Sequence, residues 1–498
     1  MELKHLTEPL LQFGTGFSED PKMGIRSFYP FDIANIRPEK IKLGIIGKSD
    51  SVDKVLQWLK YCNGYIPAKV SKNPHPKLFP SFPGFNSHEA FKAEIVTEDS
   101  YTRRLNNSEF EDIINGTNSL ELRIERIAKL YLNEIKFLSK NKNPDAILCV
   151  LSEKFITSIT EPETELSEDE VEENEDAEGE SENSEVESDD VENETEEDDE
   201  EVSEREQNFR RYLKAKAMEY NIPIQIVRDR IGRPTAEMQD AASIAWNFFT
   251  ALYYKASGTP WAMIKKEATA VTCYAGISFF KSRDRSTTQT SVAQIFNELG
   301  NGIILRGEPV DIKKDDRVPH LTEDQAFRLL DKALTEYHEA LKIFPKRLVI
   351  HKSSNYNEQE ISGFKKVARK YQISSVDMVT IQKTNLRLYR EEQYPPRRGT
   401  LLSLDEKNHL LYTRGSVEYY ETYPGKYVPS PIEVRLFSYD ESPELICHEI
   451  LALTKMNWNN TQFDRKFPIT IECARNVGEI LKYLDETEKM QLKYSFYM

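Results

Sequence analysis

The chain has 498 residues, of which 39% are hydrophobic and 10% aromatic, enough for two to four domains with sizeable cores. Its five cysteines lie far apart and lack the spacing of a Cys/His metal site, so we expect reduced thiols in an intracellular protein. No stretch reaches 18 apolar residues, and the first residues lack the apolar run of a signal peptide. We therefore expect a cytoplasmic protein with no membrane segment.

The net charge of −17 is distributed very unevenly along the chain. Residues 161–206 contain 27 Asp or Glu and a single basic residue, Arg205, and so carry a charge of −26. Without this segment, the remaining 452 residues carry +9. A basic body suits a polyanionic partner such as a nucleic acid, although +9 over so long a chain also suits ordinary solubility.

Strand and helix patterns alternate in the first half of the chain, which is typical of a parallel α/β domain. Continuous apolar runs predict the strands, and amphipathic or apolar stretches of 12 or more residues predict the helices. In chain order, the predicted elements are a strand in 41–50, a helix over 51–62, a strand over 145–151, a helix over 208–221, a strand over 222–227 and a helix over 236–257.

The acidic segment, placed at 160–206, interrupts this first domain. It has almost no apolar residues and strong like-charge repulsion, so it cannot bury enough surface to offset its ordering entropy. We expect a disordered insertion in a loop between a strand and a helix.

The second half of the chain has a different order of elements, with strands first and helices that return to a central strand. Predicted strands cover 271–280, 302–310, 346–353, 373–382 and parts of 401–439, and predicted helices cover 323–344, 357–371, 442–456 and 469–486. This order is compatible with a ribonuclease-H-like α/β sheet. We therefore divide the chain into residues 1–270 and 271–498.

Several polar residues in the first half could hold a phosphate group. Arg210 and Lys214 lie four residues apart on one predicted helix face, Gln225 lies in the following strand, and Lys255 ends a long helix. Cations, an amide and helix ends could meet around a phosphate monoester at the carboxyl edge of a parallel sheet. On spacing alone, the alternative that these side chains are simply solvated remains open.

A resemblance to a known family emerges from an ordered set of sequence blocks. These are "EPLLQFGTGFSEDPKMGIRSFYPFD", "IPIQIV", "IAWNFFTALYYKASGTPWAM", "CYAGISFF", "SVAQIFNELGNGIILRGEPV", "RLVIHKSSNY" and "LALTKMNWNNTQFDRKFPITIECARNVGEI". Together they resemble a short prokaryotic Argonaute over nearly the whole chain apart from the acidic segment. The resemblance implies a Rossmann-like MID domain followed by a ribonuclease-H-like PIWI domain.

In such proteins, the MID domain anchors the 5′-phosphate of a guide strand. The resemblance assigns this role to Lys214, Gln225 and Lys255, with Arg210 one turn before Lys214 and Asn247 as a further candidate. Two positions depart from the pattern of long Argonautes, which place an aromatic residue or His at 210 and often a Lys at 251, where this chain has Ala. In some relatives, the C-terminal carboxylate and a metal complete the pocket, which predicts Met498 with Mg²⁺ here.

In active relatives, the PIWI domain cuts the target with carboxylates that bind two Mg²⁺ ions. Here Ser278 and Ser353 stand where two of these acids belong, and the region expected to supply another holds the amides Asn457, Asn459 and Asn460. Neutral oxygens cannot neutralise two divalent cations. Glu308 and Asp464 are isolated acids, so we predict no catalytic residues, and we expect His351 and Lys352 to line a nucleic-acid groove.

The resemblance implies a subunit that holds a guide RNA or DNA and recognises a single-stranded DNA target by base pairing. Its partner would be a separate protein with an APAZ region, forming a heterodimer that could assemble further on activation. The effector would be a TIR or sirtuin-like module that depletes NAD, or a nuclease, and would serve antiviral or anti-plasmid defence by abortive infection. Two alternatives stay open: an active guide-dependent nuclease with a displaced catalytic set, and a general nucleic-acid-binding scaffold.

Overall fold

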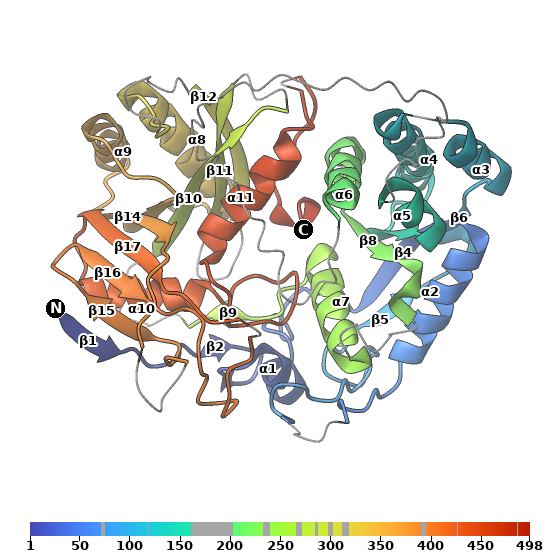
Figure 1. Ribbon diagram of the computed structural model, residues 1–498, viewed down its shortest axis with the longest axis horizontal. Coiled ribbons are helices and arrows are strands. Elements are labelled where there is room, and N and C mark those ends of the chain that lie inside the picture. Colours follow the sequence, from blue (N-terminus) through green and yellow to red (C-terminus); the bar gives the residue numbers. More distant parts are fainter. Residues whose placement is uncertain are drawn as a thin grey trace, which may run out of the picture.

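The computed structural model describes the chain except for residues 71–74, 118, 161–202, 233–239, 265–270, 284–286, 297–301, 311–317, 390–394, 426 and 486. Figure 1 shows two lobes, each built on a sheet, with the end of the chain between them. Within the part that is described, we find no helix with the length and apolar character needed to cross a membrane.

The first lobe is built on a small parallel sheet. Its strands are β4 (Lys40–Gly47), β5 (Glu94–Val96), β6 (Thr102–Arg104), β7 (Ala146–Leu151) and β8 (Ile224–Arg228). They follow the order β5-β4-β7-β8, with β6 also pairing with β4, and all of these pairs are parallel. The observed lobe therefore has the parallel α/β arrangement that the alternating pattern predicted.

Helices cover both faces of this sheet. They are α2 (Ser49–Cys62), α3 (Asn107–Gly116), α4 (Leu120–Asn141), α5 (Glu153–Thr160), α6 (Glu204–Ala217) and α7 (Ala241–Lys255), with short 3₁₀ turns η1 (Asp99–Tyr101), η2 (Met218–Tyr220) and η3 (Asp229–Gly232). All six residues of β7 are buried because successive side chains enter different cores. Leu148 and Val150 join the core that contains α2 and α7, whereas Ile147 and Cys149 join the core that contains α4, α5 and α6.

The second lobe is built on a nine-stranded mixed sheet. Its strand order is β1-β15-β16-β17-β14-β13-β10-β11-β12. The strands are β1 (Glu2–His5), β10 (Thr272–Lys281), β11 (Thr288–Phe296), β12 (Gly302–Val310), β13 (Arg347–Lys352), β14 (Ser375–Lys383), β15 (Thr400–Ser403), β16 (Asn408–Leu411) and β17 (Ile432–Ser438). The central strands β10, β13 and β14 are parallel, and the remaining pairs are antiparallel.

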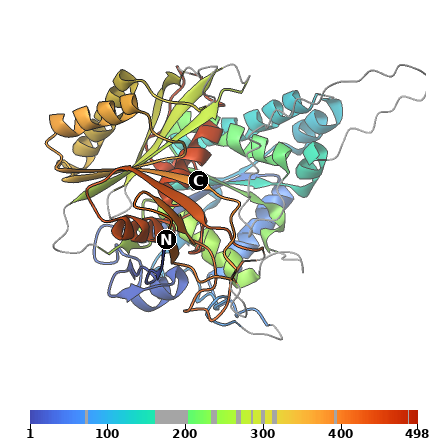
Figure 2. The same cartoon turned by 60° about the vertical axis from the view of Figure 1, so that its left-hand side comes forward.

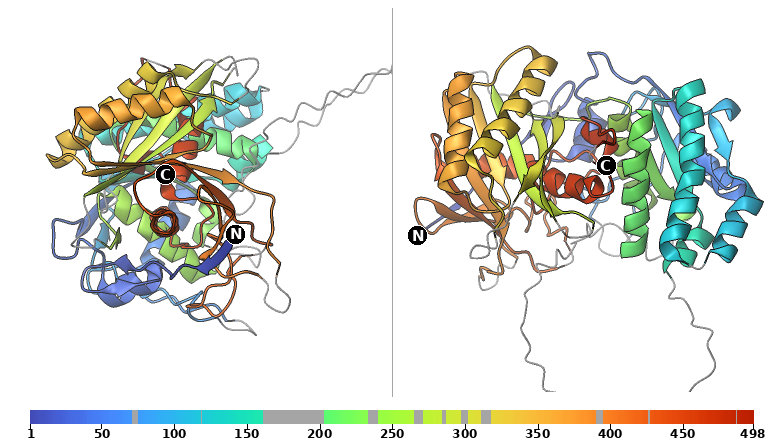
Figure 3. Two further views of the ribbon diagram at one scale, coloured as in Figure 1. Left: turned by 90° about the vertical axis from the view of Figure 1, so that its left-hand side faces the viewer. Right: turned by 90° about the horizontal axis from the view of Figure 1, so that it is seen from above.

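Two helices lie on each face of this sheet. The helices α8 (Glu323–Leu341) and α9 (Glu358–Lys370) cover one face, and α10 (Pro443–Leu453) and α11 (Ile469–Leu481) cover the other (Figures 2 and 3). The start of α11 packs tightly on β10 at Gly276, where an added Cβ would lie 2.1 Å from the Thr470 carbonyl oxygen. This contact fixes the start of α11 beside the middle of β10, two residues before the candidate catalytic position Ser278.

The amino-terminal residues do not stay within the first lobe as the predicted boundary at 270 required. Strand β1 pairs with β15 at the edge of the nine-stranded sheet. The next strands, β2 (Leu11–Gln12) and β3 (Phe17–Ser18), form a small sheet with β9 (Ala262–Met263), followed by helix α1 (Pro21–Phe28). The prediction of two consecutive units therefore misses this crossing, because short edge strands pair with residues far away in the sequence.

The predicted acidic insertion differs at both ends from the observed elements. Helix α5 lies between β7 and the insertion, so the insertion separates two helices instead of a strand and a helix. Its last residues, 204–206, belong to α6, and Glu206 is fully buried. The disorder predicted for the remainder falls on 161–202, which lies outside the described residues.

Candidate nucleic-acid interface

Three of the predicted phosphate ligands lie at one edge of the first sheet. Lys214 is in the last turn of α6, Gln225 is the second residue of β8, and Lys255 is the last residue of α7. Only the short turn η2 and a few residues connect α6 to β8, so the end of the helix and the start of the strand share an edge. The candidate site therefore faces the amino edge of the sheet, and the predicted carboxyl edge was wrong.

Lys255 is the most unusual of these residues because its ammonium group is buried, with 3% of the residue exposed. Its Nζ donates to the main-chain oxygens of Met498, at 3.0 Å, and Ser495, at 3.4 Å. Burial holds the pKa of Lys255 well below its usual range, and the nearby positive charge of Lys214 lowers the pKa further. A desolvated ammonium group next to a second positive charge favours an anion beside it.

Gln225 contributes a polar atom that the structure leaves unsatisfied. Its Oε1 is buried and has no hydrogen-bond partner in the part of the chain that the structure describes. A buried polar atom without a partner is costly, so such atoms commonly mark the place of a ligand or a water molecule. The unsatisfied amide lies on the strand that starts beside Lys214, which agrees with a polar ligand at this edge.

Arg210 does not belong to the same group of ligands. Its guanidinium group donates to Glu206 Oε1 at 2.8 Å and to the Ile226 carbonyl oxygen at 3.0 Å. Burial alone would raise the pKa of Glu206, but Arg210 and Arg228 hold it below its usual range. The prediction of Arg210 as a phosphate ligand is therefore wrong. Its guanidinium group pairs with the buried carboxylate of Glu206, which also accepts from Arg228 of β8.

Asn247 joins the two lobes. Its Oδ1 accepts hydrogen bonds from Thr461 N, at 3.0 Å, and from Thr461 Oγ1, at 2.8 Å. The same helix contacts the second lobe further along, where Tyr254 packs against Trp458 with 4.6 Å between the ring centroids. These contacts hold α7, and with it Lys255, against the loop that follows α10.

The two serines predicted to replace catalytic acids lie next to each other. Ile277 and Lys352 are paired residues of the adjacent parallel strands β10 and β13, and Ser353 N donates to the Ile277 carbonyl oxygen at 3.1 Å. The Oγ atoms of Ser278 and Ser353 are 3.5 Å apart. Among the described residues, we find no group of three or more His, Cys, Asp or Glu that could hold a metal ion.

The isolated acids near these strands have other partners. Glu308 forms an exposed, bidentate ion pair with Arg328, with both N–O distances 2.7 Å. Asp464 is buried, and its Oδ1 accepts from Gln462 Nε2 at 3.4 Å.

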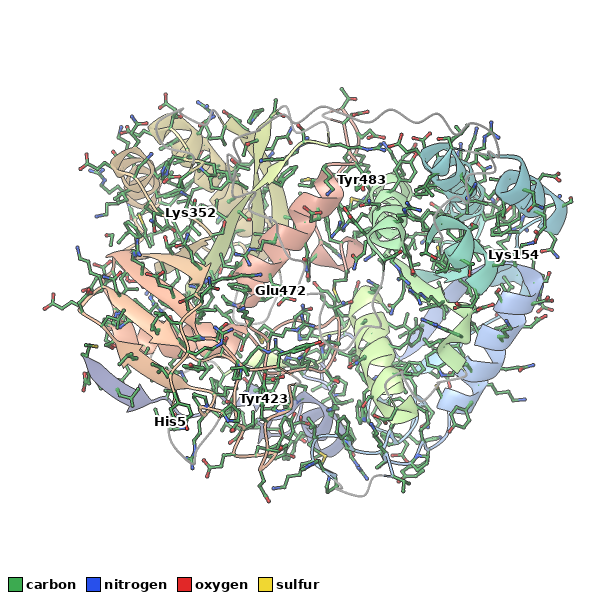
Figure 4. All side chains as sticks on the ribbon, viewed as in Figure 1. His5, Lys154, Lys352, Tyr423, Glu472 and Tyr483 are labelled. Carbon is green, nitrogen blue, oxygen red and sulfur yellow. The ribbon has the colours of Figure 1, made fainter. Side chains whose placement is uncertain are left out.

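The amide of Asn457 donates to Glu472 Oε1 at 2.8 Å. Glu472, which lies in the first turn of α11 (Figure 4), was not among the predicted site residues.

His351 and Lys352 do not line a surface groove. They are 1% and 0% exposed, respectively. A hydrogen bond of 2.8 Å joins His351 Nδ1 to Thr470 Oγ1, and burial lowers the pKa of His351 to about 3. Lys352 Nζ lies 2.7 Å from Glu360 Oε1, and that carboxylate is equally buried. The groove prediction is therefore wrong, because a strand buried on both faces hides both of its last residues.

The sequence is similar to that of one curated argonaute. No family model matches the chain. The protein argonaute of Aquifex aeolicus is 25% identical over 277 residues, which are 54% of this chain and 35% of that relative. The matched stretch is therefore well under half of the length of this curated relative.

Solved Argonaute structures share the fold over nearly the whole chain. Clostridium butyricum Argonaute, bound to a guide DNA and a 19-mer target DNA, has a TM-score of 0.64 at 14% identity and is matched over 98% of this chain and 53% of its own. Aquifex aeolicus Argonaute has a TM-score of 0.57 at 16% identity, over 100% of this chain and 56% of its own. Marinitoga piezophila Argonaute, in complex with a 5′-hydroxyl guide RNA, has a TM-score of 0.54 at 14% identity, over 100% of this chain and 59% of its own.

The predicted fold class is thereby confirmed. A Rossmann-like parallel sheet precedes a larger ribonuclease-H-like sheet, as in the MID and PIWI domains of Argonautes, and the chain corresponds to a little over half of the solved proteins. In both sequence and fold, this chain is Argonaute-like.

Proposed function

We propose that this chain binds the 5′-phosphorylated end of a guide strand at the amino edge of its first sheet. The observation that carries this proposal is the buried ammonium group of Lys255 beside Lys214. A phosphate dianion between the two would restore the stability that desolvation and mutual repulsion take from them. Gln225 lies on the same side, and its amide nitrogen is the group that would donate to the phosphate, since its unsatisfied Oε1 is an acceptor.

The guide is a short RNA or DNA, and the target is a complementary single strand of DNA. Solved structures with the same fold carry a guide DNA with a target DNA in one case and a guide RNA in another. Phosphate contacts from the protein are blind to sequence, so base pairing with the guide supplies the specificity.

The chain recognises its target without cutting it. Ser278 and Ser353 offer two neutral hydroxyl groups where metal-binding carboxylates would be needed. The activity then belongs to a separate cytoplasmic partner, an APAZ-containing effector that forms a heterodimer with this chain. On target recognition, that effector depletes NAD through a TIR or sirtuin-like module and stops the growth of the invaded cell. This part of the proposal rests on the resemblance to short Argonautes.

Magnesium at the guide 5′ end stays a prediction. From this chain, Met498 would be the only ligand predicted for the ion, and its main-chain oxygen accepts from Lys255 Nζ. The described residues form no cluster of acids, histidines or cysteines that could hold the ion. The proposed binding of the guide 5′ end does not depend on this ion.

The direct test compares guides of identical sequence that carry a 5′-phosphate or a 5′-hydroxyl group. We expect the wild type to bind the phosphorylated guide at least about tenfold more tightly, which corresponds to about 1.4 kcal/mol. Lys255→Met should remove this preference, because it keeps the length of the side chain and removes its charge.

Lys136→Met provides a matched control, since Lys136 is an exposed lysine of α4. This variant should keep the preference for the 5′-phosphate. Equal wild-type affinity for the two guides at moderate salt would overturn the proposal and favour a general nucleic-acid-binding scaffold.

A further inference from the structure

The end of α11 in the second lobe contacts α6 in the first lobe. Tyr483, which follows α11, donates from its hydroxyl group to Asn208 Oδ1 at 2.9 Å, and its ring lies edge-on to that of Tyr212, with 6.1 Å between the centroids. Glu479, one turn earlier, forms an ion pair of 3.1 Å with Arg211. Figure 1 shows the two helices side by side, and Figure 4 labels Tyr483 where they meet. These five residues are called the interlobe joint here.

Helix α6 also carries Lys214, one of the three residues of the candidate phosphate site. Asn208, Arg211 and Tyr212 are three and four residues apart, so they share one face of α6, and this face meets α11. Lys214 lies in the last turn of the helix, on a neighbouring face. Because the backbone of so short a helix is stiff, the contacts on one face determine where Lys214 lies.

Helix α11 is itself fixed closely to β10 at two glycines. Besides the contact of Gly276 with Thr470, Gly478 of α11 approaches β10 so closely that an added Cβ would lie 3.0 Å from the Cβ of Phe280. One of these contacts is near the start of α11 and the other is near its end. The interlobe joint is therefore built on a helix whose position is set by the second sheet.

The joint matters for the phosphate site because Lys214 and Lys255 repel each other. The positive charge of Lys214 contributes to the lowered pKa of Lys255, so the two ammonium groups interact. Their repulsion tends to separate α6 from α7, which ends at Lys255. The second lobe contacts both helices, α7 through the bond from Thr461 to Asn247 and α6 through the joint. These contacts oppose the separation of the two lysines.

We infer that Glu479 and Tyr483 are positioning residues for guide recognition: from the second lobe, they hold α6 where Lys214 and Lys255 can bind the same 5′-phosphate. Neither residue has to touch the phosphate, and both act through Lys214. This inference rests on the proposed function, because it takes the 5′-phosphate as the ligand. It gives the second lobe a part in phosphate recognition that is separate from the positions of Ser278 and Ser353.

The quantity that tests the inference is the phosphate preference, defined as the ratio of the Kd values for guides with a 5′-hydroxyl and a 5′-phosphate group. A change in the overall charge of the protein alters the affinity for the phosphate backbone of both guides alike, so it cancels in this ratio. A change in the position of Lys214 affects only the phosphorylated guide.

The first experiment exchanges the charges of the partly exposed ion pair between the lobes. Arg211→Glu and Glu479→Arg each place two like charges opposite each other, and each should lower the phosphate preference about threefold, a size typical of such pairs. The double variant Arg211→Glu/Glu479→Arg restores a pair of opposite charges and should regain most of the preference. Lys136→Glu makes the same charge reversal on the exposed face of α4 and should keep the wild-type preference.

The second experiment asks whether Tyr483 acts through Lys214. Tyr483→Phe removes the bond to Asn208 and keeps the ring, and we expect the phosphate preference to fall about twofold to threefold. In a Lys214→Met background, Tyr483→Phe should lower the preference no further, because the residue that it positions is gone. Equal losses in the two backgrounds would overturn the inference.

Lys352→Met separates loss of stability from loss of positioning. It removes a buried charge from β13, away from the interlobe joint, and should lower the melting temperature without changing the phosphate preference. A lower preference in this variant would show that general destabilisation explains the effects at the joint, and would overturn the inference.

The wild type decides between failure of the inference and failure of the proposed function. If the wild type prefers the phosphorylated guide and the folded single variants keep this preference, the inference is wrong and the proposed function stands. If the wild type shows no preference, both are wrong. Losses in the single variants that the charge exchange does not restore would also overturn the inference, because the two side chains would then not act as a pair.

Discussion

Ser278 and Ser353 lie side by side, with 3.5 Å between their hydroxyl oxygens. Ser278 lies within β10, and Ser353 directly follows the adjacent parallel strand β13. Ser278 is almost completely buried. Two hydroxyl groups this close can share a hydrogen bond, whereas two carboxylates would need a cation between them. We therefore expect that the wild-type pair does not bind divalent ions, and that replacing both serines with acids would allow it to.

We expect no cleavage of a guide-matched target by the purified protein with Mg²⁺ or Mn²⁺. The assay follows the length of a labelled target during a prolonged incubation. Metal-dependent cleavage that is lost in Glu308→Gln or Asp464→Asn would contradict this expectation. It would favour the alternative of an active guide-dependent nuclease with a displaced catalytic set.

A variant with two acids should behave differently from the wild type. In Ser278→Asp/Ser353→Asp, repulsion between the neighbouring carboxylates should lower the melting temperature, and Mn²⁺ should restore part of the loss by binding the folded state. Each single substitution is a control in which this restoration should be smaller. A melting temperature that does not respond to Mn²⁺ would show that the buried position cannot accept an ion.

The buried ion pair of Lys352 and Glu360 should contribute to stability and not to guide binding. Lys352→Met leaves the carboxylate without its cation, which typically costs about 3–5 kcal/mol. The double variant Lys352→Met/Glu360→Gln should regain part of this loss, because no uncompensated charge remains. Urea unfolding measures the stability, and unchanged guide affinity in the folded variants checks that neither residue contacts nucleic acid.

Substitutions of Arg210 and of Gln225 should have opposite effects on the stability of the protein and on its preference for a 5′-phosphate. Arg210→Lys should weaken the network around Glu206 and lower stability by roughly 1–3 kcal/mol, while the preference for a 5′-phosphate remains. Gln225→Leu should have the opposite effect: a weaker phosphate preference with stability unchanged or raised, since it removes an unsatisfied buried atom. Loss of the phosphate preference in Arg210→Lys would show that Arg210 contributes to phosphate binding.

His351 should make the second lobe sensitive to acid. Burial lowers its folded-state pKa to about 3, whereas the unfolded chain has an ordinary histidine pKa near 6.5. Between these values, the unfolded state binds the extra proton, so stability falls as the pH is lowered through this window. Between pH 7 and pH 5, the loss from this residue should be about 2 kcal/mol.

The pH test compares the wild type with His351→Gln, which keeps a polar partner for Thr470 and does not titrate. The loss of unfolding free energy between pH 7 and pH 5 should be smaller in the variant by about 2 kcal/mol. The same difference in both proteins would show that His351 is not held neutral in the folded state.

The sequence by itself determined the two α/β units and several of the elements that carry the candidate site. Continuous apolar runs identified β7, β8 and β12, and the resemblance to short Argonautes singled out Lys214, Gln225 and Lys255. The replacement of acids by Ser278 and Ser353 was also visible, because the chemical nature of a side chain is given by the residue type alone.

Only the tertiary structure decided which of these residues have their charges compensated and which polar groups remain unsatisfied. Arg210 and Lys352 look like exposed cations in the sequence, but each meets a buried carboxylate. Lys255 instead meets the main-chain oxygens of Ser495 and Met498. The pairing of β1 with β15 and the bridge between Ile303 and Lys493 likewise join residues that are far apart in the chain. The reason is physical: periodicity records which face of an element is apolar, whereas burial and pairing depend on contacts between elements far apart in the chain.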